Sequence, residues 1–232
     1  MLMDIFSSFD PQTHLIHESV SPLGFWLISA APMVLVHSSY WIVPNQLFWA
    51  FSVPMKVMMT QSMRTFGKSL KGFTSTTTGL FMLIISMNLS GLIPYAFSST
   101  SHLITTFSLG LPLWLALIIS SASFSPSAFA AHLLPSGAPS WLNPFLIIVE
   151  TISISVRPIT LSFRLAANMS AGHIVLGLMG VFSSATLFSS MATFSFLIAT
   201  QTIYTLFEMG ICLVQAYIFC LLLTLFSDDH SH

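Results

Sequence analysis

The sequence predicts an all-α membrane protein that crosses the bilayer several times. Of its 232 residues, 54% are hydrophobic and only 6% are charged, and the mean hydropathy is +0.86. Soluble domains carry about 25% charged residues, so a soluble chain of this composition could not cover its own core. From residue 72 to residue 226 only four side chains are formally charged: Glu150, Arg157, Arg164 and Glu208. Because a charge at the bilayer centre costs at least ~2.5 kcal/mol, each of them is a functional candidate.

The first 71 residues predict two peripheral segments around one span. Residues 1–21 are polar and mixed, and we expect an N-terminal interfacial segment. Residues 22–44 are apolar, contain Pro32 and have aromatic residues near their ends, which predicts a first, kinked span. Residues 45–71 combine Phe, Trp and Met with four of the six cations, Lys56, Arg64, Lys68 and Lys71. This pattern favours a basic amphipathic surface helix, with a simple basic loop as the alternative.

Residues 73–124 predict a helical hairpin. Its first span covers residues 73–96 and closes at Pro94, and its second covers residues 101–124 and contains Pro112. The link between them is short, so the two helices are expected to be antiparallel neighbours. Residues 125–140 contain three prolines and one glycine, which is typical of a loop.

Residues 141–226 predict a second, longer hairpin. Its first helix is expected at residues 141–178 and its second at residues 182–226, with the join near Gly177–Ser184 and a polar tail at 227–232. A single helix over 182–226 would be ~67 Å long, although a bilayer core needs only ~30 Å. Two short spans are the alternative, but no convincing turn signal occurs between 186 and 224. We therefore expect a long, steeply tilted helix.

Three of the four membrane charges are spaced by seven residues on the first of these long helices. At ~100° per residue, Glu150, Arg157 and Arg164 drift by only ~20° per step and share one face. Asn168 lies close to that face, and His173 lies on the opposite side. Carboxyl and imidazole groups can exchange protons, whereas arginine keeps its charge. Acids and a histidine near one fixed cation are what a proton path with a barrier requires.

The last helix carries a second polar pair. Glu208 and Gln215 are seven residues apart and share a face. No cation lies near Glu208 in its own helix, which favours a functional carboxyl. Structural alternatives stay open for the others: Arg157 could extend to the interface or pair with Glu150, and Asn168 and Gln215 could be hydrogen-bonding contacts between helices.

Several segments of the chain resemble one known family. They are Ser162-Phe-Arg-Leu-Ala-Ala-Asn-Met-Ser-Ala-Gly-His173, Ile148-Val-Glu150, Glu208 with Gln215-Ala-Tyr-Ile-Phe, and Asn88-Leu-Ser-Gly-Leu-Ile-Pro94. Together they resemble subunit a of mitochondrial ATP synthase, the proton-channel subunit of the membrane sector. The resemblance covers essentially the whole chain.

The resemblance implies a role for each polar residue. Arg164 would meet the carboxylates of a rotating ring of c subunits and separate two half-channels, with Asn168 and Gln215 beside it at the ring interface. The inlet half-channel, from the intermembrane space, would contain His173 and Glu208. The outlet half-channel, to the matrix, would contain two acids, Glu150 and Asp229.

The resemblance also implies the setting of the protein. It would be a non-catalytic subunit without a cofactor or a metal, multi-pass in the mitochondrial inner membrane, with the basic segment 56–71 and the C-terminus on the matrix side. Its partners would be the c-ring, peripheral-stalk and other small membrane subunits, lipid, and a second ATP synthase in a dimer, but no nucleic acid. Two alternatives from other classes are a self-contained ion or solute carrier and a purely structural membrane subunit. Carriers often show internal repeats, and none is found here.

Overall fold

The computed structural model describes Phe9, Gly24, Leu27 and residues 46–93, 97–132, 141–187 and 190–228. Within these residues all regular structure is helical. Three of the described helices are long and apolar enough to cross a membrane: α4 (Leu103–Phe124), α6 (Asn143–Thr186) and α7 (Met191–Asp228). The prediction of an all-α polytopic membrane protein is therefore confirmed.

The expected total of about five membrane helices is met only in part by the described residues. The interfacial segment 1–21 and the first span 22–44 lie almost entirely outside them. Helix α3 (Phe73–Gly91) forms where the second span was expected, but it ends at Gly91 and does not reach residue 96. It is not among the three candidate spans, since the Ser/Thr run 74–78 makes its first turns polar.

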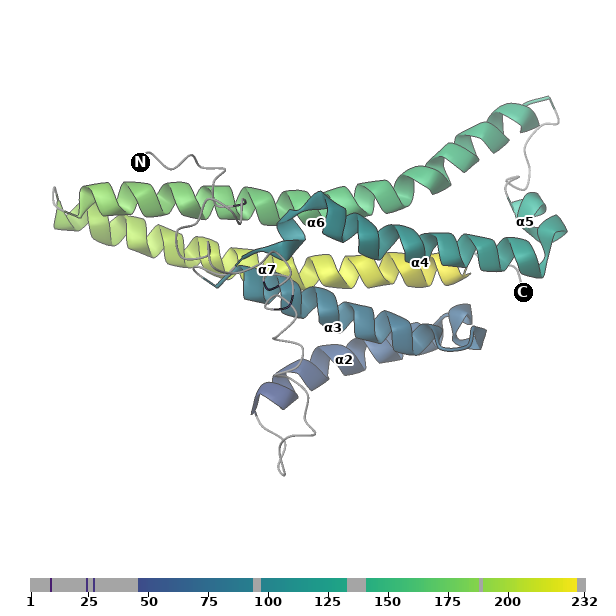
Figure 1. Cartoon of the computed structure of the whole chain (residues 1–232), viewed down its shortest axis with the longest axis horizontal. Helices are drawn as coiled ribbons and strands as arrows, with labels where there is room; N and C mark the ends of the chain where they lie inside the picture. The colour runs from purple at the N-terminus through teal and green to yellow at the C-terminus, as the bar shows by residue number, and fades with distance from the viewer. Residues whose placement is uncertain are drawn as a thin grey trace.

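Helices α6 and α7 form the long hairpin that the sequence predicts. They contain 44 and 38 residues, which corresponds to about 66 Å and 57 Å. Figure 1 shows them side by side, with their joined ends extending beyond the other described helices. The second helix is unbroken from Met191 to Asp228, so the alternative of two short spans is wrong.

The join of this hairpin lies at residues 187–190 and not near Gly177–Ser184 as expected. Gly177 and Gly180 are inside α6, where glycine is tolerated in membrane helices. The hydroxyls of Ser183 and Ser184 donate to backbone carbonyls three residues earlier, at 2.9 and 2.8 Å. Because these polar side chains bond to their own helix, they do not end it.

The expected loop at 125–140 contains a short helix, α5 (Pro126–His132). Proline is favoured in the first turn of a helix because its N–H is not needed there. The backbone N–H of Phe129 donates to the Ser125 carbonyl at 3.0 Å, which closes the first turn. The expectation of an irregular loop is therefore wrong for this part, while residues 133–140 lie outside the described ranges.

The basic segment is helical, so the loop alternative is wrong for most of it. Helix α2 (Gln46–Arg64) is followed by the short 3-10 helix η3 (Phe66–Ser69). Met58 and Ser62 of α2 are fully buried, and α2 packs along α3. The Phe66 N–H donates to Asp228 Oδ1 at 2.7 Å, which ties this segment to the end of α7.

The core lies where α3, α4, α6 and α7 meet. Its fully or nearly fully buried apolar residues include Phe81, Ile84, Leu161, Leu165, Phe219 and Leu223. Ser162 Oγ contacts the Pro158 carbonyl at 2.9 Å and the Thr106 carbonyl of α4 at 3.3 Å. Ser162 therefore faces α4, while Arg164, two residues further along α6, is exposed.

Candidate functional site

The carboxyl group of Glu208 lies directly against the backbone of Gly172 on the neighbouring long helix. Glu208 is 4% exposed. A Cβ atom at Gly172 would lie 2.7 Å from the carboxyl carbon and 2.7 and 2.9 Å from the two oxygens. A side chain at position 172 would therefore require this carboxyl group to move. The absence of a Cβ is what admits Glu208 between α6 and α7.

The surroundings of Glu208 are polar but hold no lysine or arginine among the described residues. The Tyr204 hydroxyl, one turn earlier on α7, interacts with its carboxyl group. His173 follows Gly172 and interacts electrostatically with Glu208. The ring of Phe9 lies edge-on to the His173 imidazole, with the ring centroids 6.3 Å apart. The acid and the histidine that the resemblance pairs thus lie in the same region between α6 and α7, while the buried His173 Nε2 reaches no hydrogen-bonding partner among the described residues.

Arg164 lies on an exposed face of α6, whereas Glu208 is buried between the helices. The buried face of α6 comprises Pro158, Leu161, Ser162, Leu165, Ala166, Met169 and Gly172. Arg164 is outside this set and is exposed. No described aspartate or glutamate forms an ion pair with it. The guanidinium group therefore points out of the bundle at a position well inside a membrane-length helix.

Asn168 and Gln215 line one open groove of about 480 Å³ between α6 and α7. Gln215 is 7% exposed, on the same face of α7 as Glu208. Gly210 also lines the groove, and a Cβ atom there would meet nothing within 4 Å. The amide side chains of α6 and α7 therefore lie along the same groove, next to the surface from which Arg164 projects.

Glu150, Arg164 and Glu208 lie at three different levels along the axis of α6. Glu208 is level with Gly172, which is eight residues beyond Arg164 and so about 12 Å further along the axis. Glu150, which is partly buried, precedes Arg164 by fourteen residues, or about 21 Å. The two acids therefore lie on opposite sides of the level of Arg164, and neither touches it.

Arg157 has a contact of its own. Its guanidinium group lies over the ring of Phe226, 5.1 Å from the centroid, near the end of α7. A cation over an aromatic face is a stabilising contact between helices. This contact favours the structural reading of Arg157 and separates it from Arg164, although both belong to one sequence stripe.

The structure adds a buried polar cluster that sequence reasoning did not assign to the site. Asn88 at the end of α3 is 0% exposed, and neither of its amide atoms reaches a hydrogen-bonding partner among the described residues. The same holds for the hydroxyls of Ser99 and Thr100 and for His102 Nε2. Ser99 and Thr100 belong to the 3-10 helix η4 (Ser99–Ser101). The only hint in the sequence is that these polar residues interrupt an apolar region.

This polar cluster borders the Glu208 region. Helix η4 packs against α6, and a Cβ atom at Gly91 would lie 3.3 Å from both Met169 Cε and Ser98 Cβ. The Cys212 thiol donates to Met169 Sδ at 3.5 Å. Met169 and Cys212 are each one turn from the Gly172–Glu208 contact, on α6 and α7. The buried side chains of Met169 and Cys212 thus lie between the cluster and the carboxyl group.

Asp229 lies outside the described residues. Its neighbour Asp228 accepts the backbone hydrogen bond from Phe66. No three His, Cys, Asp or Glu side chains in the described ranges come together as a metal site.

Comparison with known proteins identifies the family. The family described as "ATP synthase A chain" matches residues 22–228. The chain is 39% identical over 231 residues to ATP synthase subunit a of Albinaria caerulea, covering 99% of this chain and 100% of that one. It is 37% identical over 230 residues to the subunit a of Artemia franciscana, with 99% and 100% covered.

The chain belongs to the ATP synthase A chain family. The relative in Locusta migratoria, 35% identical over 231 residues and 99% of both chains, bears the same name. Membership makes the chain a membrane-sector subunit of ATP synthase with a role in proton translocation. Its relatives and its apolar helices indicate a multi-pass protein of the mitochondrial inner membrane. The resemblance found in the sequence is therefore confirmed at the level of the family.

Proposed function

We propose that this ATP synthase A chain conducts protons through two half-channels at different depths, separated by Arg164 at the surface that faces the c-ring. A proton would reach a ring carboxylate from one half-channel, travel with the rotating ring, and leave through the other. The chain itself would carry out no bond chemistry; its task would be to hold proton-exchanging groups and one fixed cation in place.

The observation that carries this proposal is the outward position of Arg164. An arginine facing lipid from the middle of a membrane helix is costly, and no described carboxylate of this chain pairs with it. A carboxylate supplied by another subunit would remove that cost. A ring that presents one carboxylate after another would do so repeatedly, while the permanent positive charge of arginine would bar a proton from crossing directly.

The inlet half-channel would run through the buried polar cluster to Glu208 and His173. Asn88, Ser99 and Thr100 are buried with unmet hydrogen-bonding capacity, and water is the partner expected for such groups. The side chains of Met169 and Cys212 lie between this cluster and Glu208. Asn168 and Gln215 would then hydrogen-bond the water through which the proton reaches the ring, along the groove that they line.

The outlet half-channel would begin on the other side of Arg164. Glu150 lies about 21 Å back along α6, near the end of the bundle that carries the cations. Asp229 would extend this path beyond α7. By the positive-inside rule, the basic segment 56–71 and the C-terminus would face the matrix, so this half-channel would open there.

The same arrangement suggests which surfaces meet other subunits. The exposed side of the α6–α7 hairpin, around Arg164, would face the c-ring. Helix α2, with apolar side chains such as Trp49 and Val53 exposed, would face peripheral-stalk and other small membrane subunits, lipid, or a second complex in a dimer.

The test compares two arginines of one helix. In vesicles containing the assembled complex, Arg164→Gln should abolish ATP-driven proton pumping, because ring carboxylates lose their fixed partner. Arg157→Gln should retain pumping, because that residue contacts Phe226 instead. Pumping at the normal rate in Arg164→Gln would overturn the proposal and would favour a purely structural subunit.

A further inference from the structure

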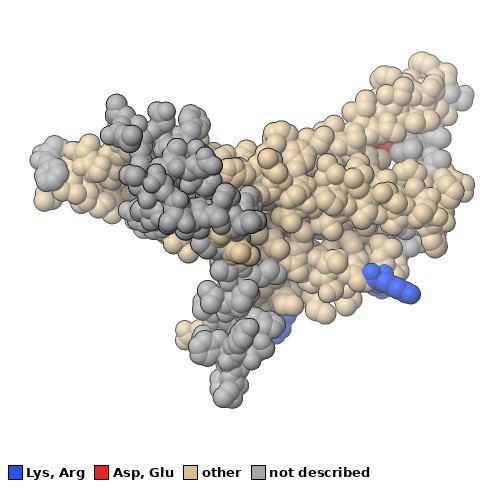
Figure 2. Space-filling model, viewed as in Figure 1, with Lys and Arg blue, Asp and Glu red and all other residues tan. Residues whose placement is uncertain are grey.

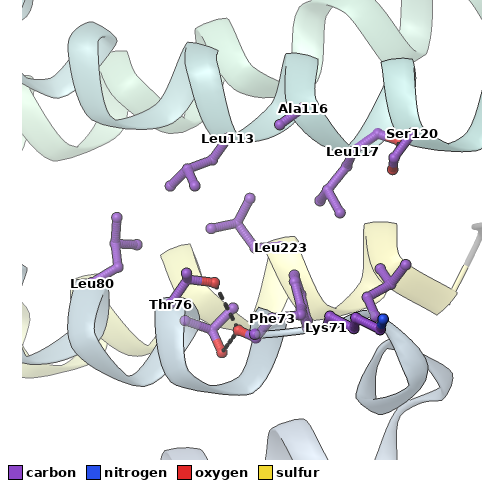
Figure 3. Close-up of a pocket in the computed structure, with 12 residues that line it drawn as sticks. Lys71, Phe73, Thr76, Leu80, Leu113, Ala116, Leu117, Ser120 and Leu223 are labelled. Carbon is purple, nitrogen blue, oxygen red and sulfur yellow. Dashed lines mark hydrogen bonds between the residues drawn. The ribbon is translucent and has the colours of Figure 1, made fainter.

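A groove between α3, α4 and α7 lies outside the proposed proton path. Its volume is about 330 Å³, within the range of ~300–1,000 Å³ that is usual for ligand pockets. Its walls are apolar: Phe73 and Leu80 come from α3, Leu113 and Leu117 from α4, and Leu223 from α7. Figure 3 shows these side chains converging on one elongated space.

The polar side chains that line the groove already have backbone partners. The hydroxyls of Thr76 and Thr77 donate to the Phe73 carbonyl at 2.9 and 3.0 Å, as the dashed lines in Figure 3 show. Ser120 Oγ donates to the Leu117 carbonyl at 2.8 Å. The groove therefore offers hydrocarbon along its length and makes little demand for a polar ligand there.

One end of the groove is positively charged. Lys71 is the charged residue among those that line it, and Figure 3 places it with Ser120 at one end, whereas Leu80 and Leu113 lie at the other. Lys71 forms no ion pair within the described residues. An anion at this end would therefore find an unused ammonium group.

The surface around this end of the groove is also positively charged. Residues 46–93 contain four cations and no acid. Arg64, Lys68 and Lys71 lie within eight residues and are all exposed. Figure 2 shows blue at two separate places along the lower edge of a face that is otherwise almost uncharged, one of them near the end where α2 and α3 connect. An apolar groove that opens at a basic edge matches a molecule with a hydrocarbon chain and an anionic group.

We propose that this groove binds an anionic phospholipid, with one acyl chain along Leu80 and Leu113 and the phosphate at Lys71. A free phosphate would leave the apolar part unused, and a neutral lipid would leave Lys71 unpaired. A helix of another subunit is about 10–12 Å across with its side chains, whereas an acyl chain is a single row of carbons. A groove of about 330 Å³ with apolar walls favours the thinner occupant.

The proposal is tested on the assembled complex by counting retained lipid. Complexes are washed in detergent, and their bound phospholipids are extracted and quantified by class with mass spectrometry. Lys71→Gln removes the charge, and Ala116→Phe fills the groove. Each should lose one anionic phospholipid per complex. The matched controls Lys68→Gln and Ala185→Phe, which do not line the groove, should retain it.

Two results would overturn the proposal. One is retention of the lipid in both groove variants, and the other is its loss only in Ala116→Phe, since Lys71 would then recognise nothing. Proton pumping is measured in the same samples and should persist, so failure here is distinguishable from failure of the proton path. Should Ala116→Phe not assemble, a photoactivatable phosphatidic acid added to the unmodified complex should label peptides containing Leu80 or Leu113. Labelling confined to other surfaces contradicts the site.

Discussion

The carboxyl group of Glu208 on α7 lies 2.7–2.9 Å from the position that a Cβ atom of Gly172 on α6 would take. This contact fixes the depth of Glu208 in the bundle and places His173 beside it. A change at either residue therefore alters the position of the proton-exchanging group, and not only its chemistry.

The first prediction concerns this contact. Gly172→Ala should displace the Glu208 carboxyl group and lower ATP-driven proton pumping by ~100-fold, since a misplacement of about 1 Å can cost that much. Gly177→Ala is the matched control on the same helix, because a Cβ atom there meets nothing within 4 Å. Pumping is measured as acidification of vesicles. Equal rates in the two variants would contradict the role given to the contact.

The second prediction concerns the interaction of the Tyr204 hydroxyl with the Glu208 carboxyl group. Tyr204→Phe removes the hydroxyl and should slow pumping by roughly 5-fold, because an interaction of about 1 kcal/mol is lost. Tyr217→Phe, on the same helix and packed against the apolar core, should leave the rate unchanged. If Tyr204→Phe pumps as fast as that control, the hydroxyl does not serve the carboxyl group.

The third prediction concerns the buried polar cluster. Asn88→Leu should leave assembly of the complex intact, because replacing an unpaired buried amide by a similar apolar group is close to neutral. It should nevertheless slow proton uptake by removing a group that holds water. Ser86→Ala is the control, as that hydroxyl donates to the Leu83 carbonyl within α3. Stopped-flow measurement of the pumping rate decides; an unchanged rate in Asn88→Leu places the inlet elsewhere.

The fourth prediction concerns the attachment of the basic segment. A Cβ atom at Gly67 would overlap the side chain of Ser227 and lie 3.0 Å from Phe73 Cε1. Gly67→Ala should therefore destabilise the packing of η3 on α7 by about 1–3 kcal/mol, measured as a lower temperature of detergent-induced disassembly. Gly79→Ala meets open space and should not lower that temperature. A Gly67→Ala complex as stable as that control would rule out this tight packing.

The long helices could be predicted because their pattern is local. The absence of proline from 182 to 226, with Glu208 as the one charged residue, predicts one continuous helix, and α7 confirms it from residue 191 onwards. The join was misplaced because glycine and serine were interpreted as a turn. Inside a membrane helix both residue types are ordinary, and the serine hydroxyls donate to carbonyls of the preceding turn.

The partners across helices could not be predicted, because they depend on how two helices slide and rotate against each other. The seven-residue stripe grouped Arg157 with Arg164, yet the packing gives Arg157 an aromatic contact and leaves Arg164 outward. The resemblance paired Glu208 with His173, but nothing in the sequence shows that Gly172 makes room for the carboxyl group. Asn88 became a candidate only when its burial was known.

The central claim is that the outward arginine meets carboxylates of a rotating partner. The most direct measurement is an experimental structure of the assembled membrane sector, in which the group facing Arg164 is identified. The proposed function predicts a ring of c subunits there, with a carboxyl group within about 4 Å of the guanidinium group at one rotary position. Lipid, or a subunit without a carboxyl group, opposite Arg164 would contradict it.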